Sequence, residues 1–354
     1  MSKKNLQLTI DFMLNKTDNY FCLKWERRDE PEDFPYFCGQ RMENSNFSYG
    51  FLNKLLHLPI IASGNIKIRK DKLKVELPIP KDIPVYTNIH FLKSHLQKSI
   101  RLKKTNLAIP TAKHLIEIDP IQFLRRLAII FVEDVMITQH YSILIWLMIA
   151  ISSKKITLQL NHIEWLLGLV YIACECKWKE NYNVPEMDDF SNEKYAKHIS
   201  DLSQNLDKYQ QAIIQSLIIR SSFGGMQGDT RMLLNAAYIW YNRFIGEDIK
   251  WKEYYYQPIR TISASVIPLE KSDWILSAID YHCFPKMTDW IMDKLEENME
   301  EEEIKSLIWN FSSKTNYRKN YDCSTEQFIG NEKRWEIIKK QVLSIQKYAI
   351  KNFS

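Results

Sequence analysis

Apolar residues return at helical spacing through most of the chain from residue 89 onward. Two stripes of this kind are Leu92, Leu96 and Ile100, and then Leu124, Leu127, Ile130 and Phe131. Apolar residues that recur every three or four positions cover one face of an α-helix. We expect further helices over roughly 139–152, 159–178, 192–222, 230–244, 271–283, 286–310 and 325–351. The pattern therefore predicts a multi-helix bundle or array.

Two sites between residues 89 and 135 indicate where helices end or begin. Pro110 marks a predicted break in the helical pattern. Asp119 stands directly before Pro120. This pair favours the start of a helix, because the carboxylate can accept a hydrogen bond from a free backbone N–H group and proline suits the first helical position.

The first 88 residues follow a different pattern. Apolar and polar residues alternate over 64–78 on both sides of a polar turn, which predicts a β-hairpin. Three prolines between residues 78 and 84 then interrupt the alternation. We predict an N-terminal α+β part over 1–88 and a helical domain over 89–354. The predicted fold class is mainly α, with a small β-containing N-terminal part, and α+β overall.

Composition narrows the possible protein classes. The 354-residue chain is 45% hydrophobic and 26% charged, which is typical of a globular protein. It has only 9 glycines, and scarce glycine argues against a nucleotide-binding α/β fold, which needs several tight glycine turns. The six cysteines include no CxxC pair, so neither a disulfide scaffold nor a structural zinc site is expected. No cofactor is indicated.

Hydropathy also bears on location. The residues from Met1 onward are polar and lack the apolar core of a secretory signal. The longest apolar run, Ile143–Ile151, is less than half the length of a membrane span. We expect an intracellular protein, in the cytoplasm or the nucleus, that is not secreted and has no membrane partner.

Charge is segregated along the chain, although the net charge is only +5. Between Lys93 and Arg126 there are eight basic residues against two acidic ones, and from Ile304 onward there are ten against four. A nucleic-acid footprint depends on such clustering. Residues 309–321 also interleave aromatic rings with Lys and Arg, which suits stacking on unpaired bases. The candidate nucleic-acid-binding residues are Lys98, Arg101, Lys103, Lys104, Arg125, Arg126, Lys314, Arg318 and Lys319.

The first basic segment resembles part of a known family. Leu96–Arg101 reads LQKSIR, and further on the chain reads DP from Asp119, RRL from Arg125 and EDV from Glu133. Over about residues 91–135 this is similar to the helical C-terminal region of clamp-loader-like ATPases, the RarA (MgsA) and Werner-helicase-interacting-protein group. The resemblance implies a helical, oligomer-forming assembly element linked to DNA replication or repair.

The resemblance does not extend to the ATPase. The chain has no GxxxxGKS/T phosphate-binding motif, and it does not follow the family after residue 150. ATP hydrolysis is therefore not implied. A structural alternative is that Arg125, Arg126, Glu133 and Asp134 tie neighbouring helices together as ion pairs.

Three of the nine glycines fall within five residues of the segment Ser221–Arg231. One of them can end the preceding helix, and Asp229 can cap a helix that begins near Thr230. Free N–H groups ahead of a helix can also bind an anion. The segment is therefore either a tight helix–helix corner or a ligand site. The candidate phosphate-binding residues are Gly224, Gly225, Gly228 and Arg231.

Asp280, His282 and Cys283 lie within four residues. Side chains at successive helical positions do not converge, so we expect a buried His and Cys with local hydrogen bonds rather than a nucleophile or metal site. An active site would therefore have to combine side chains from segments that are far apart in the sequence. The candidate catalytic residues for that case are Asp229, Arg231, Asp280 and His282.

The basic segments favour one function over two alternatives. The favoured function is a non-enzymatic helical protein that associates with DNA or RNA, or with a DNA replication or repair assembly. The first alternative is an enzyme whose site combines the Gly224–Arg231 corner with Asp280 and His282. The second is a structural or interaction subunit of a larger complex, such as a homo-oligomer.

Overall fold

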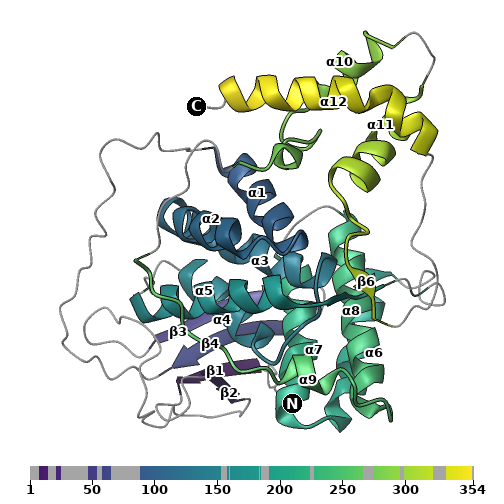
Figure 1. Cartoon of the computed structure of the whole chain (residues 1–354). Coiled ribbons are helices and arrows are strands. Elements are labelled where there is room, and N and C mark those ends of the chain that lie inside the picture. The colour runs from purple at the N-terminus through teal and green to yellow at the C-terminus, as the bar shows by residue number, and fades with distance from the viewer. Residues whose placement is uncertain are drawn as a thin grey trace. The chain divides into compact units, whose positions relative to one another are not determined.

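The structure, a computed structural model of the chain, is mainly α-helical (Figure 1). It describes the backbone of four N-terminal strands and then residues 88–152, 158, 160–182, 184, 191–223, 227–265, 274–295, 299–321 and 332–352. The helices are α1 (Ile89–Arg101), α2 (Thr105–Ile118), α3 (Pro120–Glu133), α4 (Tyr141–Ser152), α5 (Leu160–Glu175), α6 (Asn192–Leu202), α7 (Lys208–Ser221), α8 (Gln227–Ile245), α9 (Lys252–Tyr255), α10 (Met287–Met292), α11 (Glu301–Leu307) and α12 (Glu332–Asn352). The expected mainly-α fold is confirmed.

The described strands form two sheets. The four N-terminal strands are β1 (Leu8–Leu14), β2 (Phe21–Lys24), β3 (Phe47–Asn53) and β4 (Leu58–Gly64). Their order is β2-β1-β4-β3, with β1 parallel to β4 and the other neighbours antiparallel. A short parallel pair joins β5 (Trp178–Lys179) to β6 (Lys319–Asn320). The hairpin predicted near 64–78 lies outside the described residues, which reach Gly64 and resume at Asn88.

The chain divides into two compact units. The first unit comprises Met1–Lys74, Met136–Leu169 and Asn181–Thr261, and the second comprises Val75–Val135, Val170–Glu180 and Ile262–Ser354. Each unit is thus built from segments that are separated in the sequence. The predicted division into 1–88 and 89–354 stays a prediction.

In the first unit, α4 is apolar on all sides and its residues from Ile143 to Ile149 are buried. It packs on α7 and on β1, β2 and β4, as expected for a helix without a polar face. Gly168 of α5 allows a close approach of backbone, because a Cβ atom there would lie 2.2 Å from the Arg260 carbonyl oxygen. Only glycine fits at this crossing.

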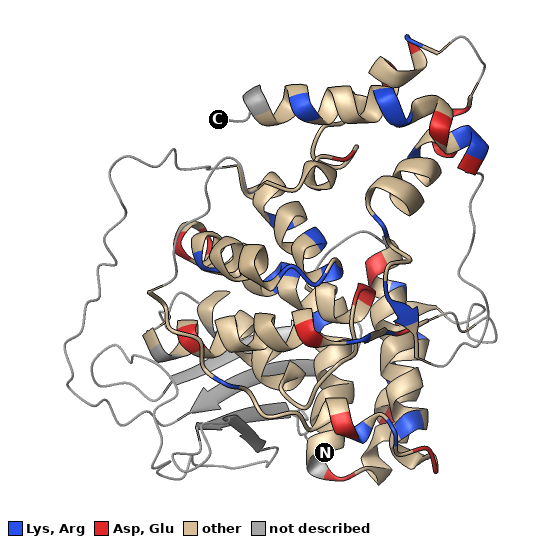
Figure 2. Ribbon diagram, viewed as in Figure 1, with Lys and Arg blue, Asp and Glu red and all other residues tan. Residues whose placement is uncertain are grey.

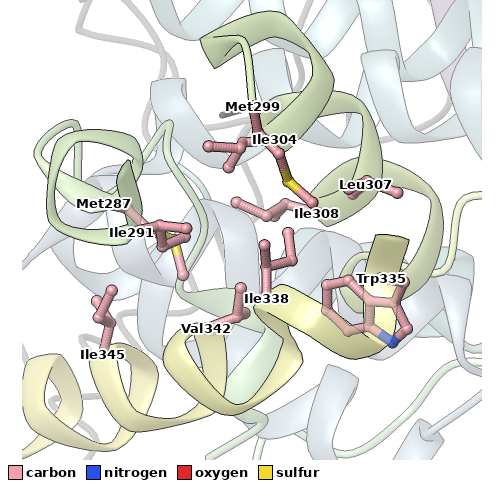
Figure 3. Packing of buried hydrophobic residues seen from close by; sticks show 10 residues of the cluster. All are labelled: Met287, Ile291, Met299, Ile304, Leu307, Ile308, Trp335, Ile338, Val342 and Ile345. Carbon is pink, nitrogen blue, oxygen red and sulfur yellow. The ribbon is translucent and has the colours of Figure 1, made fainter. Parts of the chain in front are cut away.

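In the second unit, α1, α2 and α3 pack with both predicted apolar stripes inside. Asp119 caps α3 as predicted, since its carboxylate accepts a hydrogen bond from the Gln122 N–H group at 3.0 Å. A separate apolar cluster joins α10, α11, the π-helical turn Ile308–Ser312 and α12 (Figure 3). Its buried members are Met287, Ile291, Met299, Ile304, Leu307, Ile308, Trp335, Ile338, Val342 and Ile345. The cluster anchors the segment that leads into residues 313–321.

Several predicted helix limits are wrong. The helix expected over 192–222 is split into α6 and α7, because Asp207 accepts two backbone hydrogen bonds and starts a new helix. The expected helix over 271–283 is replaced by a single 3-10 turn at Leu276–Ala278 within the described residues. The one expected over 286–310 consists of α10 and α11. Pro110 lies inside α2 rather than at a break, since burial of its neighbours outweighs one lost hydrogen bond.

None of the helices within the described ranges combines the length and the apolar character that crossing a bilayer requires.

Candidate nucleic-acid interface

Three of the nine basic residues predicted to bind nucleic acid lie in the interior of the second unit. Lys98, Arg101 and Arg318 expose only 3%, 2% and 2% of their surface. A buried charge is tolerated when it is paired or well hydrogen-bonded. Each of the three has such partners, which remove it from the predicted contact surface.

Arg101, the last residue of α1, is held by Asp134. Its Nε donates to Asp134 Oδ1, and its Nη2 donates to Oδ2 at 3.2 Å. Its Nη1 donates to the Ser313 carbonyl at 2.9 Å. Burial opposes the charge of Arg101, but Asp134 more than offsets this and raises the pKa of the guanidinium. Arg101 thereby connects the end of α1 to the end of α3 and to the segment that begins at Ser313.

Lys98, one turn earlier on α1, is paired with Asp280. Its Nζ also donates to Ser94 Oγ at 2.8 Å. Burial alone would raise the pKa of the Asp280 carboxyl, but the Lys98 ammonium holds that pKa well below its usual range. Asp280 is therefore ionised at neutral pH, and its pairing with Lys98 fixes α1 to the turn at residues 280–283.

Gln97 on α1 contacts charged residues in the middle of α3 and at its C-terminal end. Its Nε2 donates to Asp134 Oδ2 at 2.9 Å and also to Glu133, and its Oε1 accepts from Arg126 Nη1 at 3.1 Å. Burial and then the Asp134 charge raise the pKa of Glu133. Several residues that carry the family resemblance thus form one network, which ties α1 to α3 through the Arg101–Asp134 ion pair and the hydrogen bonds of Gln97.

Arg125 and Arg126 are half-buried. Both lie near Lys93, whose pKa is lowered first by burial and then by these two positive charges. Lys93 donates to Gln122 Oε1 at 3.1 Å. Together Lys93, Arg125 and Arg126 form a group of positive charge on α1 and α3.

Arg318 caps two helices at once. Its guanidinium donates to the carbonyls of Ile100 and Arg101 at the end of α1. It also donates to those of Ala173, at 2.9 Å, and Cys174, at 3.2 Å, near the end of α5. The last carbonyls of a helix lack an intrahelical partner and carry partial negative charge. One buried cation therefore stabilises both helix ends.

Four further lysines lie on two turns that these arginines join, or on β6 directly after the second turn, and all four are exposed. They are Lys103, Lys104, Lys314 and Lys319. We call them the lysine surface. Arg101 bonds to the Ser313 carbonyl and Arg318 bonds to the last carbonyls of α1, so the two turns are held side by side. Figure 2 shows Lys and Arg in the turn after α1 and on β6. None of the four lysines forms an ion pair with a residue that the structure describes.

Lys103 and Lys314 have a left-handed backbone, with φ of 57° and 50°. No other non-glycine residue in the described part of the chain has a positive φ. The N–H groups of Lys103 and Lys104 donate to the carbonyls of Ile100, at 3.0 Å, and Ser99, at 2.8 Å. This is the Schellman motif, in which glycine is the usual residue at the position of Lys103. A side chain there costs about 1 kcal/mol.

The β5–β6 pair brings an aromatic ring to the lysine surface. Trp178 and Lys319 are direct partners across the two strands, so their side chains point to the same face, and both are exposed. Lys179 points to the other face, where its Nζ donates to the Thr315 carbonyl at 2.8 Å. Burial lowers the pKa of Lys179. The Asp134 charge acts in the opposite direction, and the Arg101 charge lowers the pKa further.

Lys177 and Trp178 are not among the nine predicted nucleic-acid-binding residues, although both are exposed beside this surface. They directly follow the apolar helix α5, in the order Lys177-Trp178-Lys179. An aromatic ring between two lysines has the same composition as residues 309–321. That likeness is the signal that could have identified them.

The glycine-rich corner is only partly described, and Gly224 and Gly225 lie outside the described residues. Asp229 is not the N-cap of a helix near Thr230, because α8 already begins at Gln227. It lies in the first turn of α8, where a carboxylate is favourable beside the positive helix end. A Cβ atom on Gly228 would meet nothing within 4 Å. The Arg231 guanidinium lies 4.6 Å from the centre of the Tyr195 ring. A phosphate site here stays a prediction.

Asp280 and His282 contact each other in a turn. The His282 N–H donates to Asp280 Oδ1 at 3.0 Å, and its Nδ1 lies 3.3 Å from the same oxygen. The His282 side chain is 44% exposed, which corrects the expectation of a buried histidine. Burial and then the Asp280 charge raise the pKa of the Cys283 thiol, which makes it a poor nucleophile. The other candidate catalytic residues, Asp229 and Arg231, belong to the first unit, and a shared site stays a prediction.

No group of three His, Cys, Asp or Glu side chains that could hold a metal ion occurs among the described residues. Comparisons with protein-family models, with curated proteins and with solved structures give no match for this chain.

Proposed function

We propose that this chain binds nucleic acid through the lysine surface, without catalysing a reaction. The observation that carries the proposal is the pair of adjoining basic turns, in which Lys103 and Lys314 both occupy left-handed positions. Backbone strain is commonly found at functional sites. Phosphate groups are the ligand that such lysines suit, because each contact releases a condensed counterion.

The expected binding is independent of base sequence. Phosphate contacts position a protein on the backbone of DNA or RNA but carry no base information. Four contacts give a slope of log K against log salt concentration of about −3 to −4. A steep salt dependence therefore accompanies the proposed mode of binding.

We extend the proposal to an assembly role for α1–α3. The family resemblance over 91–135 supports a helical element of a DNA replication or repair complex, with other copies of this chain or with other proteins as partners. The lysine surface begins directly after the LQKSIR segment. The proposal includes an α+β fold overall, with a small β-containing N-terminal part, and an intracellular location.

Fluorescence anisotropy with labelled single-stranded DNA, duplex DNA and RNA across a salt series tests the proposal. We expect the variant Lys103→Glu/Lys104→Glu to bind at least about tenfold more weakly at low salt, with a salt slope smaller by about 2. The matched control is Lys194→Glu/Lys197→Glu, which reverses two exposed charges on α6 in the first unit. We expect the control to bind within about twofold of the wild type.

Two results would contradict the proposal. If the two variants weakened binding equally, the lysine surface would not be the contact site, and Lys93, Arg125 and Arg126 would be tested next. If the wild type bound no nucleic acid even at low salt, binding itself would be excluded. The exposed imidazole of His282 beside the ionised Asp280 would then favour the enzyme alternative.

A further inference from the structure

Two aromatic side chains flank the lysine surface with much of their surface exposed. Tyr317 is 51% exposed and lies between Lys314 and Lys319 in the sequence. Trp178 is 37% exposed and is the cross-strand partner of Lys319. Packing of the interior does not require large aromatic side chains at this exposure beside lysines that have no ion-pair partner among the described residues.

Local contacts hold the Trp178 ring and the backbone of Tyr317 in place. The Trp178 ring packs edge-to-face on Tyr321, with 6.2 Å between ring centres. The Tyr321 N–H donates to the Lys179 carbonyl at 2.9 Å, which continues the β5–β6 pairing. The Tyr317 N–H donates to the Lys314 carbonyl at 3.0 Å, which closes the turn that carries both residues. The indole ring and the turn that carries the phenol ring are therefore positioned before any ligand arrives, which lowers the cost of ordering them on binding.

Rings and lysines recognise different features of a nucleic acid. Lysine contacts to phosphate are available in single strands and in duplexes. Stacking on an aromatic side chain needs a base whose face is free, and in a duplex the bases are already stacked on one another. A stacked base improves affinity about tenfold for each ring. The rings should therefore favour the single strand, whereas the lysine contacts release slightly more counterion from a duplex and do not favour the single strand.

We infer that Trp178 and Tyr317 give the lysine surface a preference for single-stranded over duplex nucleic acid. This inference rests on the proposed function, since the lysines supply the phosphate contacts that bring bases to the rings. The ligand is an unpaired stretch of DNA or RNA, with phosphates along the two basic turns and bases stacked on the indole and phenol rings.

The test compares the affinities for single strands and for a duplex of equal length, about 20 nucleotides or base pairs, at one salt concentration. Oligothymidylate and oligouridylate are the single-stranded probes. The wild type should bind both at least about tenfold more tightly than the duplex. In Trp178→Ala/Tyr317→Ala the single-strand affinity should fall by about tenfold or more, while the duplex affinity stays within about twofold.

Two further variants separate stacking from structural effects. Trp178→Phe/Tyr317→Phe keeps a ring at both positions and should retain most of the preference. Tyr209→Ala removes a tyrosine of the first unit that is 59% exposed, and should change neither affinity. Equal affinities of the wild type for single strand and duplex would overturn the inference, as would an equal loss of both in the Ala variant. Either outcome leaves the proposed function intact, whereas absence of all binding overturns both.

Discussion

Basic residues a few positions apart have opposite environments in the second unit. Lys98, Arg101 and Arg318 are buried. Their sequence neighbours Lys103, Lys104, Lys314 and Lys319 are exposed. All seven contribute equally to the charge clusters of the sequence, yet the buried ones hold the unit together and the exposed ones are free to contact a ligand. A cluster of charge in the sequence therefore predicts neither role alone.

Position relative to the end of α1 separates Lys98 and Arg101 from Lys103 and Lys104. Lys98 and Arg101 are three residues apart on one face of α1, the face that meets Asp280 and Asp134. Lys103 follows the end of that helix, where the chain turns outward. A buried charge needs specific partners, whereas an exposed one does not. Substitutions at the buried and at the exposed residues should therefore change stability by different amounts.

The largest effect is expected for Arg318→Met. This change removes a donor from four carbonyls at the ends of α1 and α5, of which Ile100 keeps the Lys103 N–H group, so the free energy of unfolding should fall by about 4 kcal/mol. Urea unfolding followed by circular dichroism measures it. Lys319→Ala, the adjacent exposed cation, should change stability by less than about 0.5 kcal/mol. Similar losses in the two variants would show that burial does not distinguish them.

A somewhat smaller loss, about 3 kcal/mol at neutral pH, is expected for Lys98→Met. The variant leaves the Asp280 carboxylate buried without its ammonium partner. In the wild type the lowered pKa of Asp280 stabilises the fold above its unfolded value of about 3.9, and this stabilisation is lost as the pH falls. In the variant Asp280 prefers its protonated form. The stability difference between the two proteins should therefore shrink from pH 7 to pH 3.

The double variant Lys98→Met/Asp280→Asn is the control for this pair. Asparagine keeps an oxygen that can accept from the His282 N–H group, but it has no charge to bury. Stability at neutral pH should recover by at least half of the loss. If the double variant were less stable than Lys98→Met alone, the uncompensated carboxylate would not be the cause.

Sequence periodicity was sufficient for the parts of the fold that are locally determined. The stripes on α1 and α3 and the Asp119 cap were predictable, because helical spacing and capping depend on neighbours in the chain. The cap at Asp207, which divides 192–222, is of the same local kind as that at Asp119, but helical periodicity alone does not record it. The turn at 280–283 was not predictable, because Asp280 is paired with Lys98, 182 residues away. At Pro110 local propensity predicts the end of a helix, but α2 continues through this residue because its neighbours are buried.

The candidate site was only partly predictable for a related reason. The basic composition of residues 98–104 and 314–319 was visible in the sequence. Which residues turn inward was not, because the partners of Arg318 are backbone carbonyls 144 to 218 residues away. Trp178 reaches the surface through a strand pair of only two residues, too short to leave an alternating pattern.

The smallest effect on the free energy of unfolding, and one of opposite sign, is expected at Lys103 and Lys314, whose backbone is left-handed. Lys103→Gly and Lys314→Gly should each raise the free energy of unfolding by about 0.5–1 kcal/mol, because glycine adopts a positive φ without a Cβ clash. Lys319→Gly makes the same change in a strand and should instead lower it by about 0.5 kcal/mol. Thermal unfolding of the three variants compares these signs directly.

Lys103→Gly and Lys314→Gly should also weaken nucleic-acid binding by removing one phosphate contact each, so in these two variants stability and binding would change in opposite directions. That combination would mean that the left-handed lysines reduce the stability of the fold in favour of ligand contact, whereas Lys98 and Arg101 increase it. If Lys103→Gly stabilised the protein and left the salt slope unchanged, Lys103 would be strained without contacting phosphate. The lysine surface would then begin at Lys104, the residue at which the chain enters α2.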